Sequence, residues 1–270
     1  MRRAKRAKRL YRCRREGGGY LEVLEDDVHR WMHFGSHLQQ SSMRLEDPSE
    51  LALPYTRRMM NALLFAPDPQ RILMIGLGGG SMARFLLRHF PDACMDAVEM
   101  DPAVAWVAHH FFQLQEHPGL VIHQGEGLAY LRDKVQNGEQ GYDLILVDAF
   151  DHEGMASVLL LEDFHRKCRA LLSSNGVCAY NLSKRLPIPY ETVLAGLRAS
   201  YEGAALLPAE VTSNNVIAFA LTRPLEADFK GVLRQRATLL SRVMNVEFST
   251  KLTPLLAVTS PFWRNWLGGV

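Results

Sequence analysis

The hydrophobic pattern between Arg71 and Asp101 predicts a strand, a helix and a second strand in succession. Ile72 to Ile75 form a short, wholly apolar run that ends at glycine, which is typical of a strand buried on both faces of a parallel sheet. Apolar residues then recur at helical spacing over Ser81 to His89. A second apolar run, Cys94 to Val98, ends at Glu99. We therefore expect a β-α-β unit with a glycine turn at its first junction.

Alternating strands and helices continue through the rest of the chain. Further strands are expected over Leu120 to His123, Tyr142 to Val147, Val177 to Tyr180, Ala204 to Ala209 and Val216 to Leu221, and further helices over Asp101 to Phe112, Leu128 to Val135, Leu159 to Leu172, Pro189 to Tyr201 and 225–245. Strands that alternate with helices of this length form a mainly parallel sheet covered on both faces. The pattern predicts an α/β fold with a Rossmann-like, doubly wound sheet.

The region before this sheet has a different pattern. Between Tyr20 and Met43 the apolar residues are interrupted by acidic and turn-forming residues, which favours short antiparallel strands over a helix. An amphipathic helix, broken early by Pro54, is expected over Leu51 to Phe65. We expect four parts: a disordered basic tail (1–19), a small N-terminal β-hairpin subdomain with a linking helix (20–66), a Rossmann-like nucleoside-binding domain (67–250) and an apolar C-terminal tail (251–270).

The glycine turn has the spacing of a nucleoside-binding loop. Gly76, Gly78 and Gly80 give G-x-G-x-G, whereas the dinucleotide fingerprint G-x-G-x-x-G would need glycine at Ser81. Glycine lets the backbone turn at positive φ and lets a ligand approach closely. A carboxylate at the end of the second strand can accept both ribose hydroxyls, and Glu99 holds that place. These features favour S-adenosylmethionine or a relative over NAD.

Polar residues also follow two later strands. Glu126 lies in the triplet Gly125-Glu126-Gly127, and Asp148 and Asp151 follow the strand that ends at Val147. Ligands of a doubly wound sheet lie beyond the carboxyl ends of its strands, so these acids, Glu99 and the glycine turn are expected to form one site. An aspartate pair after a strand can also cap the next helix or close a turn.

Composition excludes several other classes. The 270 residues are 47% apolar, which is enough for one large α/β domain. The sequence contains no run of 18 or more apolar residues, the length that would be needed to span a membrane. The four cysteines, three of them in expected core elements, show no C-x-x-C spacing, which indicates a reduced, cytoplasmic protein without disulfides or zinc. If His29, His33 and His37 are on strands, each is about 13 Å from the next, which is too far for them to share a metal ion. No metal site is therefore expected.

The formal charge of +2 conceals an asymmetry. Nine of the 31 Lys and Arg residues lie within 1–15, which leaves 22 basic against 29 acidic residues in the remainder, so the body of the protein is acidic. No apolar segment follows the basic stretch, as a secretory signal would require. We expect a solvated tail, with contact to nucleic acid or another anionic surface as the alternative.

The order of these motifs resembles the polyamine aminopropyltransferases, the spermidine and spermine synthases, over about residues 20 to 225. The similar segments are GLGGGS (76–81), VEMDP (98–102), GEG (125–127), YDLILVDAFD (142–151) and LEDFHRKCRALLSSNGV (161–177). The resemblance implies a divergent spermidine synthase-like enzyme. Its fold would be a class I S-adenosylmethionine-dependent methyltransferase type with a small N-terminal β domain, and it would commonly be a homodimer.

The resemblance also implies roles for individual residues. Gly76, Gly78 and Gly80 would line the donor site, Glu99 would bind the ribose, and Glu126 with Gly127 would lie near the adenine. Asp148 would be the catalytic aspartate and Asp151 the second acid that holds an amine. Tyr55 and Gln39 would contact the substrate.

The chemistry suits these residues. A primary amine must lose a proton to attack a carbon of the donor sulfonium; Asp148 can accept that proton while Asp151 anchors the ammonium group. The expected donor is decarboxylated S-adenosylmethionine, and the expected acceptor is a small amine.

Two alternatives remain open. The family usually has an aspartate at the position of Gly79 and a carboxylate near Arg57, and their replacement favours a small-molecule methyltransferase that uses intact S-adenosylmethionine and holds an anionic acceptor through Arg57 or Arg58. A catalytically idle nucleoside-binding module is the other alternative.

Overall fold

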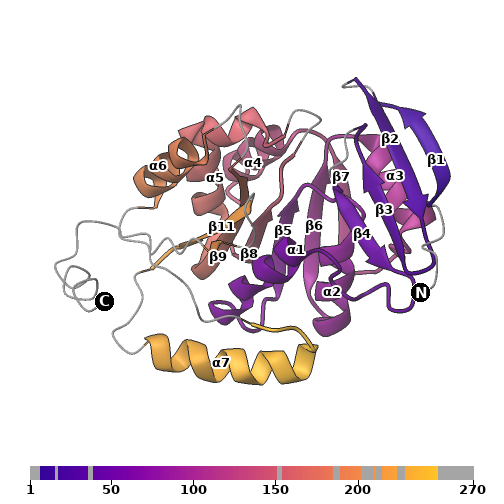
Figure 1. The fold of residues 1–270 in the computed structure, drawn as a ribbon. Coiled ribbons are helices and arrows are strands. Elements are labelled where there is room, and N and C mark those ends of the chain that lie inside the picture. Colours follow the sequence, from indigo (N-terminus) through magenta and orange to yellow (C-terminus); the bar gives the residue numbers. More distant parts are fainter. Residues whose placement is uncertain are drawn as a thin grey trace.

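The computed structural model describes residues 7–15, 18–35, 39–150, 154–184, 189–201, 209–210, 215–223 and 229–248. Its centre is a seven-stranded sheet (Figure 1), which runs in spatial order β10 (Ala209–Glu210), β11 (Asn215–Leu221), β9 (Leu172–Ser183), β8 (Tyr142–Val147), β5 (Arg71–Ile75), β6 (Cys94–Glu99) and β7 (Leu120–Gln124). Strands β5 to β9 pair in parallel, and β11 is antiparallel to β9. The predicted α/β doubly wound sheet is confirmed.

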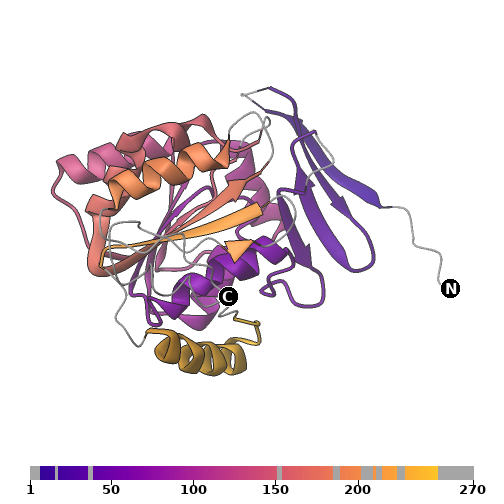
Figure 2. The same cartoon turned by 60° about the vertical axis from the view of Figure 1, so that its left-hand side comes forward.

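Helices cover both faces of this sheet (Figures 1 and 2). One face carries α4 (Gly127–Gln136), α5 (Glu162–Leu171) and α6 (Tyr190–Ser200) over an apolar cluster centred on Ile145, Phe164 and Cys178. The other carries α1 (Pro54–Met59), the 3-10 helix η1 (Met60–Leu64), α2 (Ser81–His89) and α7 (Phe229–Met244) over a cluster that includes Met74 and Leu146. Within the described residues, no helix is long and apolar enough to cross a membrane.

A second, four-stranded antiparallel sheet lies beside the main one (Figure 1) and consists, in order, of β1 (Lys8–Arg14), β2 (Tyr20–Glu25), β3 (His29–His33) and β4 (Ser41–Arg44). Its buried residues Leu21, Val23 and Met32 pack with Val104 and Val107 of α3 (Pro102–Phe111). The antiparallel strands expected between Tyr20 and Met43 are therefore present, and α3 joins the small sheet to the large one.

The expectation of a disordered tail over 1–19 is wrong for Lys8–Arg14, which form β1. The basic run conceals an edge strand, because Tyr11 and Cys13 pack against the apolar cluster of the small sheet while Arg9 and Arg12 pair with Glu22 of β2 at 3.0 and 3.4 Å. The charge of this segment predicts a solvated tail, whereas the apolar side chains that alternate with the arginines are what place it in the sheet.

Other elements and residues also differ from the prediction. The helix expected over Leu51 to Phe65 begins at Pro54 and ends as η1, because proline suits the first helical position and its ring disfavours helix before it. Cys94, expected in the core, is exposed, whereas Cys168 and Cys178 are buried and free. The strand expected over Ala204 to Ala209 and the apolar tail over 251–270 lie almost entirely outside the described residues.

The strand order places a crevice at one point of the sheet. Strand β5 lies between β6 and β8, so the chain leaves β5 in one direction and later returns on its other side. Loops after such neighbouring strands diverge, and ligands of doubly wound sheets occupy the gap between them.

Candidate functional site

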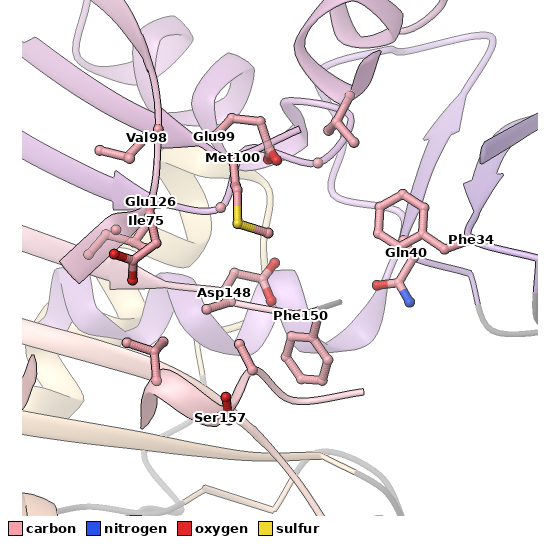
Figure 3. Close-up of a pocket in the computed structure, with 18 of the residues that line it drawn as sticks. Phe34, Gln40, Ile75, Val98, Glu99, Met100, Glu126, Asp148, Phe150 and Ser157 are labelled. Atoms are coloured by element: carbon pink, nitrogen blue, oxygen red, sulfur yellow. The ribbon is translucent and has the colours of Figure 1, made fainter. Parts of the chain in front are cut away.

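A cavity of about 280 Å³ lies at this crevice (Figure 3). The predicted site residues on its wall come from four strand ends: Gly76 and Gly78 after β5, Glu99 as the last residue of β6, Glu126 and Gly127 after β7, and Asp148 after β8. Tyr55 of α1 completes this group. The four strand ends therefore meet at one cavity, as their order in the sequence predicts.

The glycine turn is shaped by close backbone contact. Gly76 has a φ of 89°, donates its N–H to the Val98 carbonyl at 2.9 Å, and would place a Cβ only 2.3 Å from the Asp148 carbonyl oxygen. Asp148 in turn donates its N–H to the Ile75 carbonyl at 2.9 Å. Glycine is required here because the loops after β5 and β8 touch backbone to backbone.

Glu99 is fixed by backbone amides. Its Oε2 accepts from Leu77 N at 3.0 Å and its Oε1 from Asp101 N at 2.9 Å. Burial raises the pKa of this carboxyl, while the amide hydrogen bonds oppose that rise. An ionised carboxylate has about four acceptor positions, so Glu99 keeps capacity for hydroxyl donors in the cavity.

Asp148 is the most strongly perturbed carboxyl of the cavity. Burial, with a contribution from Glu99, raises its pKa to about 6, although hydrogen bonds from Asn181 Nδ2 (2.8 Å) and the Tyr55 hydroxyl (3.1 Å) lower it. A carboxyl with a pKa near neutrality is suited to accepting a proton during a reaction.

Glu126 has a second, structural task. Its carboxylate caps α4 by accepting from Leu128 N at 3.3 Å and Ala129 N at 3.2 Å, while the residue still lines the cavity. Gly127 would bring a Cβ to 2.8 Å from Ile75 Cγ2. The triplet therefore both begins a helix and shapes the cavity wall.

Of the remaining predicted site residues, two lie away from the described cavity wall and one is not described. Asp151 is outside the described residues. Gly80 caps the start of α2 with a φ of 69° and is not on the described cavity wall. Gln39 is exposed, and its neighbour Gln40 lines the cavity instead.

Sequence reasoning missed the contribution of the small sheet. Arg15, Phe34 and Gln40 reach the cavity from it, and Figure 3 shows Phe34 and Gln40 on the side opposite Glu126. Asn181, near the end of β9, was also missed, although an amide at the end of the strand next to β8 was a usable signal.

The two departures from the family pattern have structural explanations. Gly79 donates its N–H to Ser41 Oγ at 2.7 Å, and a Cβ at position 79 would lie 3.0 Å from the Phe112 ring and from Ser41 Cβ. The guanidinium of Arg57 is bonded to the carbonyls of Leu51 and Ala52 at 2.5 and 3.1 Å. Arg57 thus supports its own loop and is absent from the described cavity wall.

Across the described ranges, no group of three or more His, Cys, Asp or Glu side chains is arranged to hold a metal ion. The cavity residues described above are three acids (Glu99, Glu126 and Asp148), glycines, the aromatic residues Phe34 and Tyr55, the amide Gln40 and the cation Arg15. This composition suits a nucleoside with a cationic substituent.

Comparison with known proteins places this site in context. A profile of the spermine/spermidine synthase domain matches residues 53–186. A polyamine aminopropyltransferase of Chromobacterium violaceum is 38% identical over 84% of this chain and 86% of its own, and one of Neisseria meningitidis is 37% identical over 91% and 93%. A human eEF1A lysine and N-terminal methyltransferase is 33% identical over 53% of this chain and 22% of its own.

Solved structures agree on the fold. Human methyltransferase-like protein 13 in complex with SAH matches with a TM-score of 0.64 and 29% identity, over 72% of this chain and 93% of that one. A spermidine synthase in complex with the transition state analogue AdoDATO matches with a TM-score of 0.69 and 16% identity, over 90% of this chain and 81% of that one. The arrangement is therefore the class I methyltransferase-like fold with an added N-terminal sheet.

Proposed function

The chain belongs to the polyamine aminopropyltransferase family, and from that premise we propose that it transfers an aminopropyl group from decarboxylated S-adenosylmethionine to a small amine. The observation that carries the proposal is the position of Asp148, a buried carboxyl with a pKa of about 6 at the meeting point of the glycine turn and the β6 end. Aminopropyl transfer is favoured over methyl transfer or binding alone because the aminopropyltransferase relatives match most of both chains.

In the proposed reaction the amine nitrogen attacks the aminopropyl carbon bonded to the sulfonium sulfur. The new C–N bond forms as the C–S bond breaks, the bonding electrons go to sulfur, and 5′-methylthioadenosine leaves. Asp148 accepts the proton that the amine loses, while Asn181 and Tyr55 hold its carboxylate in place.

The remaining residues bind and orient the two substrates. Glu99 accepts hydrogen bonds from the ribose hydroxyls, Gly76 and Gly78 allow close approach of the donor, and Glu126 with Gly127 lies toward the adenine. Asp151 anchors the second ammonium group of the acceptor. Tyr55 contacts the acceptor together with Gln40, which lines the cavity in place of the exposed Gln39. The acidic wall supports a cationic acceptor, because opposite charge attracts it to the cavity.

The direct test is product analysis. The full chain is incubated with decarboxylated S-adenosylmethionine and a series of diamines and polyamines, and 5′-methylthioadenosine and the elongated amine are quantified by mass spectrometry. Equal amounts of both products are expected. A methylated acceptor formed only from intact S-adenosylmethionine would contradict the proposal.

The rate should depend on pH through Asp148. Because the base must be ionised, kcat/KM is expected to rise with pH through about 6 and then to level off until other groups titrate. Tyr55→Phe removes a hydrogen bond that lowers the pKa of Asp148, so its profile should shift to higher pH. A profile identical to that of wild type would show that Tyr55 does not tune this carboxyl.

We also propose, from the family resemblance, that the protein is a homodimer in the cytoplasm. Sedimentation of the full chain tests the first statement, and a monomer at micromolar concentration would contradict it. Cell fractionation tests the second.

A further inference from the structure

Arg15 is held rigidly at the edge of the cavity. Its Nε donates to Asp101 Oδ2 at 2.7 Å, and its guanidinium carbon lies 3.8 Å from the centroid of the Phe34 ring. Two hydrogen bonds fix its backbone, since Arg15 N donates to the Gly19 carbonyl and Gly18 N to the Arg15 carbonyl, both at 3.2 Å. Only 6% of the side chain is exposed. Such a side chain loses little further entropy when a ligand binds.

One nitrogen of this guanidinium makes no hydrogen bond within the described part of the protein. Arg15 Nη1 is buried and has no hydrogen-bond partner among the described residues, although the residue lines the cavity. Asp101 does not supply a second bond to it; its Oδ1 instead caps α3 by accepting from Ala103 N at 3.0 Å. A buried donor left unsatisfied is destabilising, and a ligand oxygen in the cavity would relieve that cost.

The ion pair also fixes where Arg15 lies along the ligand. Asp101 donates its backbone N–H to Glu99 Oε1 at 2.9 Å, so Arg15 and Glu99 are joined through a single residue at the end of β6. Glu99 is the acceptor expected for the ribose. Arg15 is therefore at the ribose end of the cavity.

The charge of Arg15 is balanced before any ligand arrives. Because Asp101 is buried against it, with 8% of its side chain exposed, the pair presents an N–H donor with little net charge. A neutral oxygen suits this donor. A ribose hydroxyl that donates its hydrogen bond to Glu99 retains lone pairs and can accept a second hydrogen bond.

We propose that Arg15 binds the donor: its guanidinium donates a hydrogen bond to the oxygen of a ribose hydroxyl, and that hydroxyl in turn donates a hydrogen bond to Glu99. The inference rests on the proposed function only in that the cavity takes an adenosine-containing donor. It makes the small N-terminal sheet part of the donor site and makes the ribose hydroxyls a condition of binding.

Calorimetric titration with 5′-methylthioadenosine and its 2′-deoxy and 3′-deoxy analogues tests this directly. In wild type, loss of the contacted hydroxyl is expected to weaken binding by about tenfold or more, the range for hydrogen bonds to charged groups. In Arg15→Met that penalty should shrink several-fold, because only the Glu99 bond remains to be lost. Arg12→Met is the matched control: Arg12 lies on β1, three positions before Arg15, with 44% of its side chain exposed, and its variant should keep the wild-type penalty.

A second variant distinguishes loss of the hydrogen bond from damage to the fold. Arg15→Met leaves Asp101 buried without its partner, so the double variant Arg15→Met/Asp101→Asn is measured as well; an asparagine at 101 can still cap α3 through its side-chain oxygen. The deoxy penalty should be reduced in the double variant too.

The outcomes separate this inference from the proposed function. An unchanged deoxy penalty in both Arg15 variants would overturn the inference alone. The inference would also be overturned if the Arg15 variants lost affinity for S-adenosylhomocysteine but not for 5′-methylthioadenosine, since Arg15 would then bind the amino-acid carboxylate of the ligand. Failure of wild type to bind any of these nucleosides would overturn the proposed function and the inference together.

Discussion

Replacing Asp148 with asparagine is expected to lower kcat by about 10²–10⁴-fold, the range for loss of a general base. Affinity for 5′-methylthioadenosine should be nearly unchanged, because the nucleoside is held by Glu99 and the glycine turn. Steady-state kinetics and calorimetry on the same preparation measure both quantities. The combination of a lost rate and a retained ligand identifies Asp148 as a residue of the chemical step.

The substitution should be tolerated by the surrounding structure. Asn181 Nδ2 donates to Asp148 Oδ1 at 2.8 Å and can donate equally to an amide oxygen. The Tyr55 hydroxyl lies 3.1 Å from Asp148 Oδ2 and 3.3 Å from the Gln40 carbonyl, so it can donate to Gln40 and accept from an amide at 148. A collapse of the fold is therefore not the expected cause of lost activity.

The same variant should be more stable than wild type at neutral pH. Since folding raises the pKa of Asp148 from 3.8 to about 6, the folded state binds its proton more tightly, and stability falls as pH rises between those values. Above pH 6 the ionised carboxylate then costs roughly 3 kcal/mol at 1.36 kcal/mol per pKa unit. Thermal melting should show Asp148→Asn above wild type at pH 7, with the difference lost below about pH 4.

Asp143→Asn provides the matched control, because Asp143 lies at the opposite end of β8 and bonds to Gln70 N, Arg71 N and Ser173 Oγ. It should reduce stability and leave kcat within a small factor of wild type. If Asp148→Asn retained wild-type kcat, Asp148 would not be the proton acceptor.

Two elements of the α/β domain could be predicted with their boundaries because each boundary has a local cause. The helix over Ser81–His89 and the strand over Tyr142–Val147 are found with the predicted limits. A glycine turn precedes the first, and the second is an apolar run that ends at an aspartate. The meeting of Gly76, Glu99 and Asp148 was equally predictable, since strand ends of a parallel sheet share one edge.

What could not be predicted depends on contacts between distant segments. Arg15 looks like one more charge in a basic run, and only its pairing with Asp101, 86 positions away, distinguishes it from Arg12 or Arg14. Gln39 and Gln40 are chemically identical neighbours, so the path of the backbone into β4 decides which one faces the cavity. Neither distinction can be predicted from the residues that are adjacent in the sequence.

The largest loss of stability is expected from Gly76→Ala. The residue has a φ of 89°, where a side chain is strained by about 1–3 kcal/mol, and the added Cβ would lie 2.3 Å from the Asp148 carbonyl oxygen. The Gly76–Val98 and Asp148–Ile75 backbone bonds, both 2.9 Å, oppose the shift that would relieve this contact. With overpacking of about 1–3 kcal/mol added, the melting temperature should fall by about 10 °C and nucleoside binding should be lost.

Gly138→Ala separates the two contributions to this loss. Gly138 has a φ of 72°, and a Cβ there would meet no described heavy atom within 4 Å, so its variant carries only the backbone strain. It should melt a few degrees below wild type, on the order of 2–4 °C per kcal/mol, and bind nucleoside normally. Equal melting temperatures for the two variants would mean that the loops after β5 and β8 can separate. Because Asp148 begins the second of these loops, the contact at Gly76 would then not be what holds the catalytic carboxylate against the donor turn.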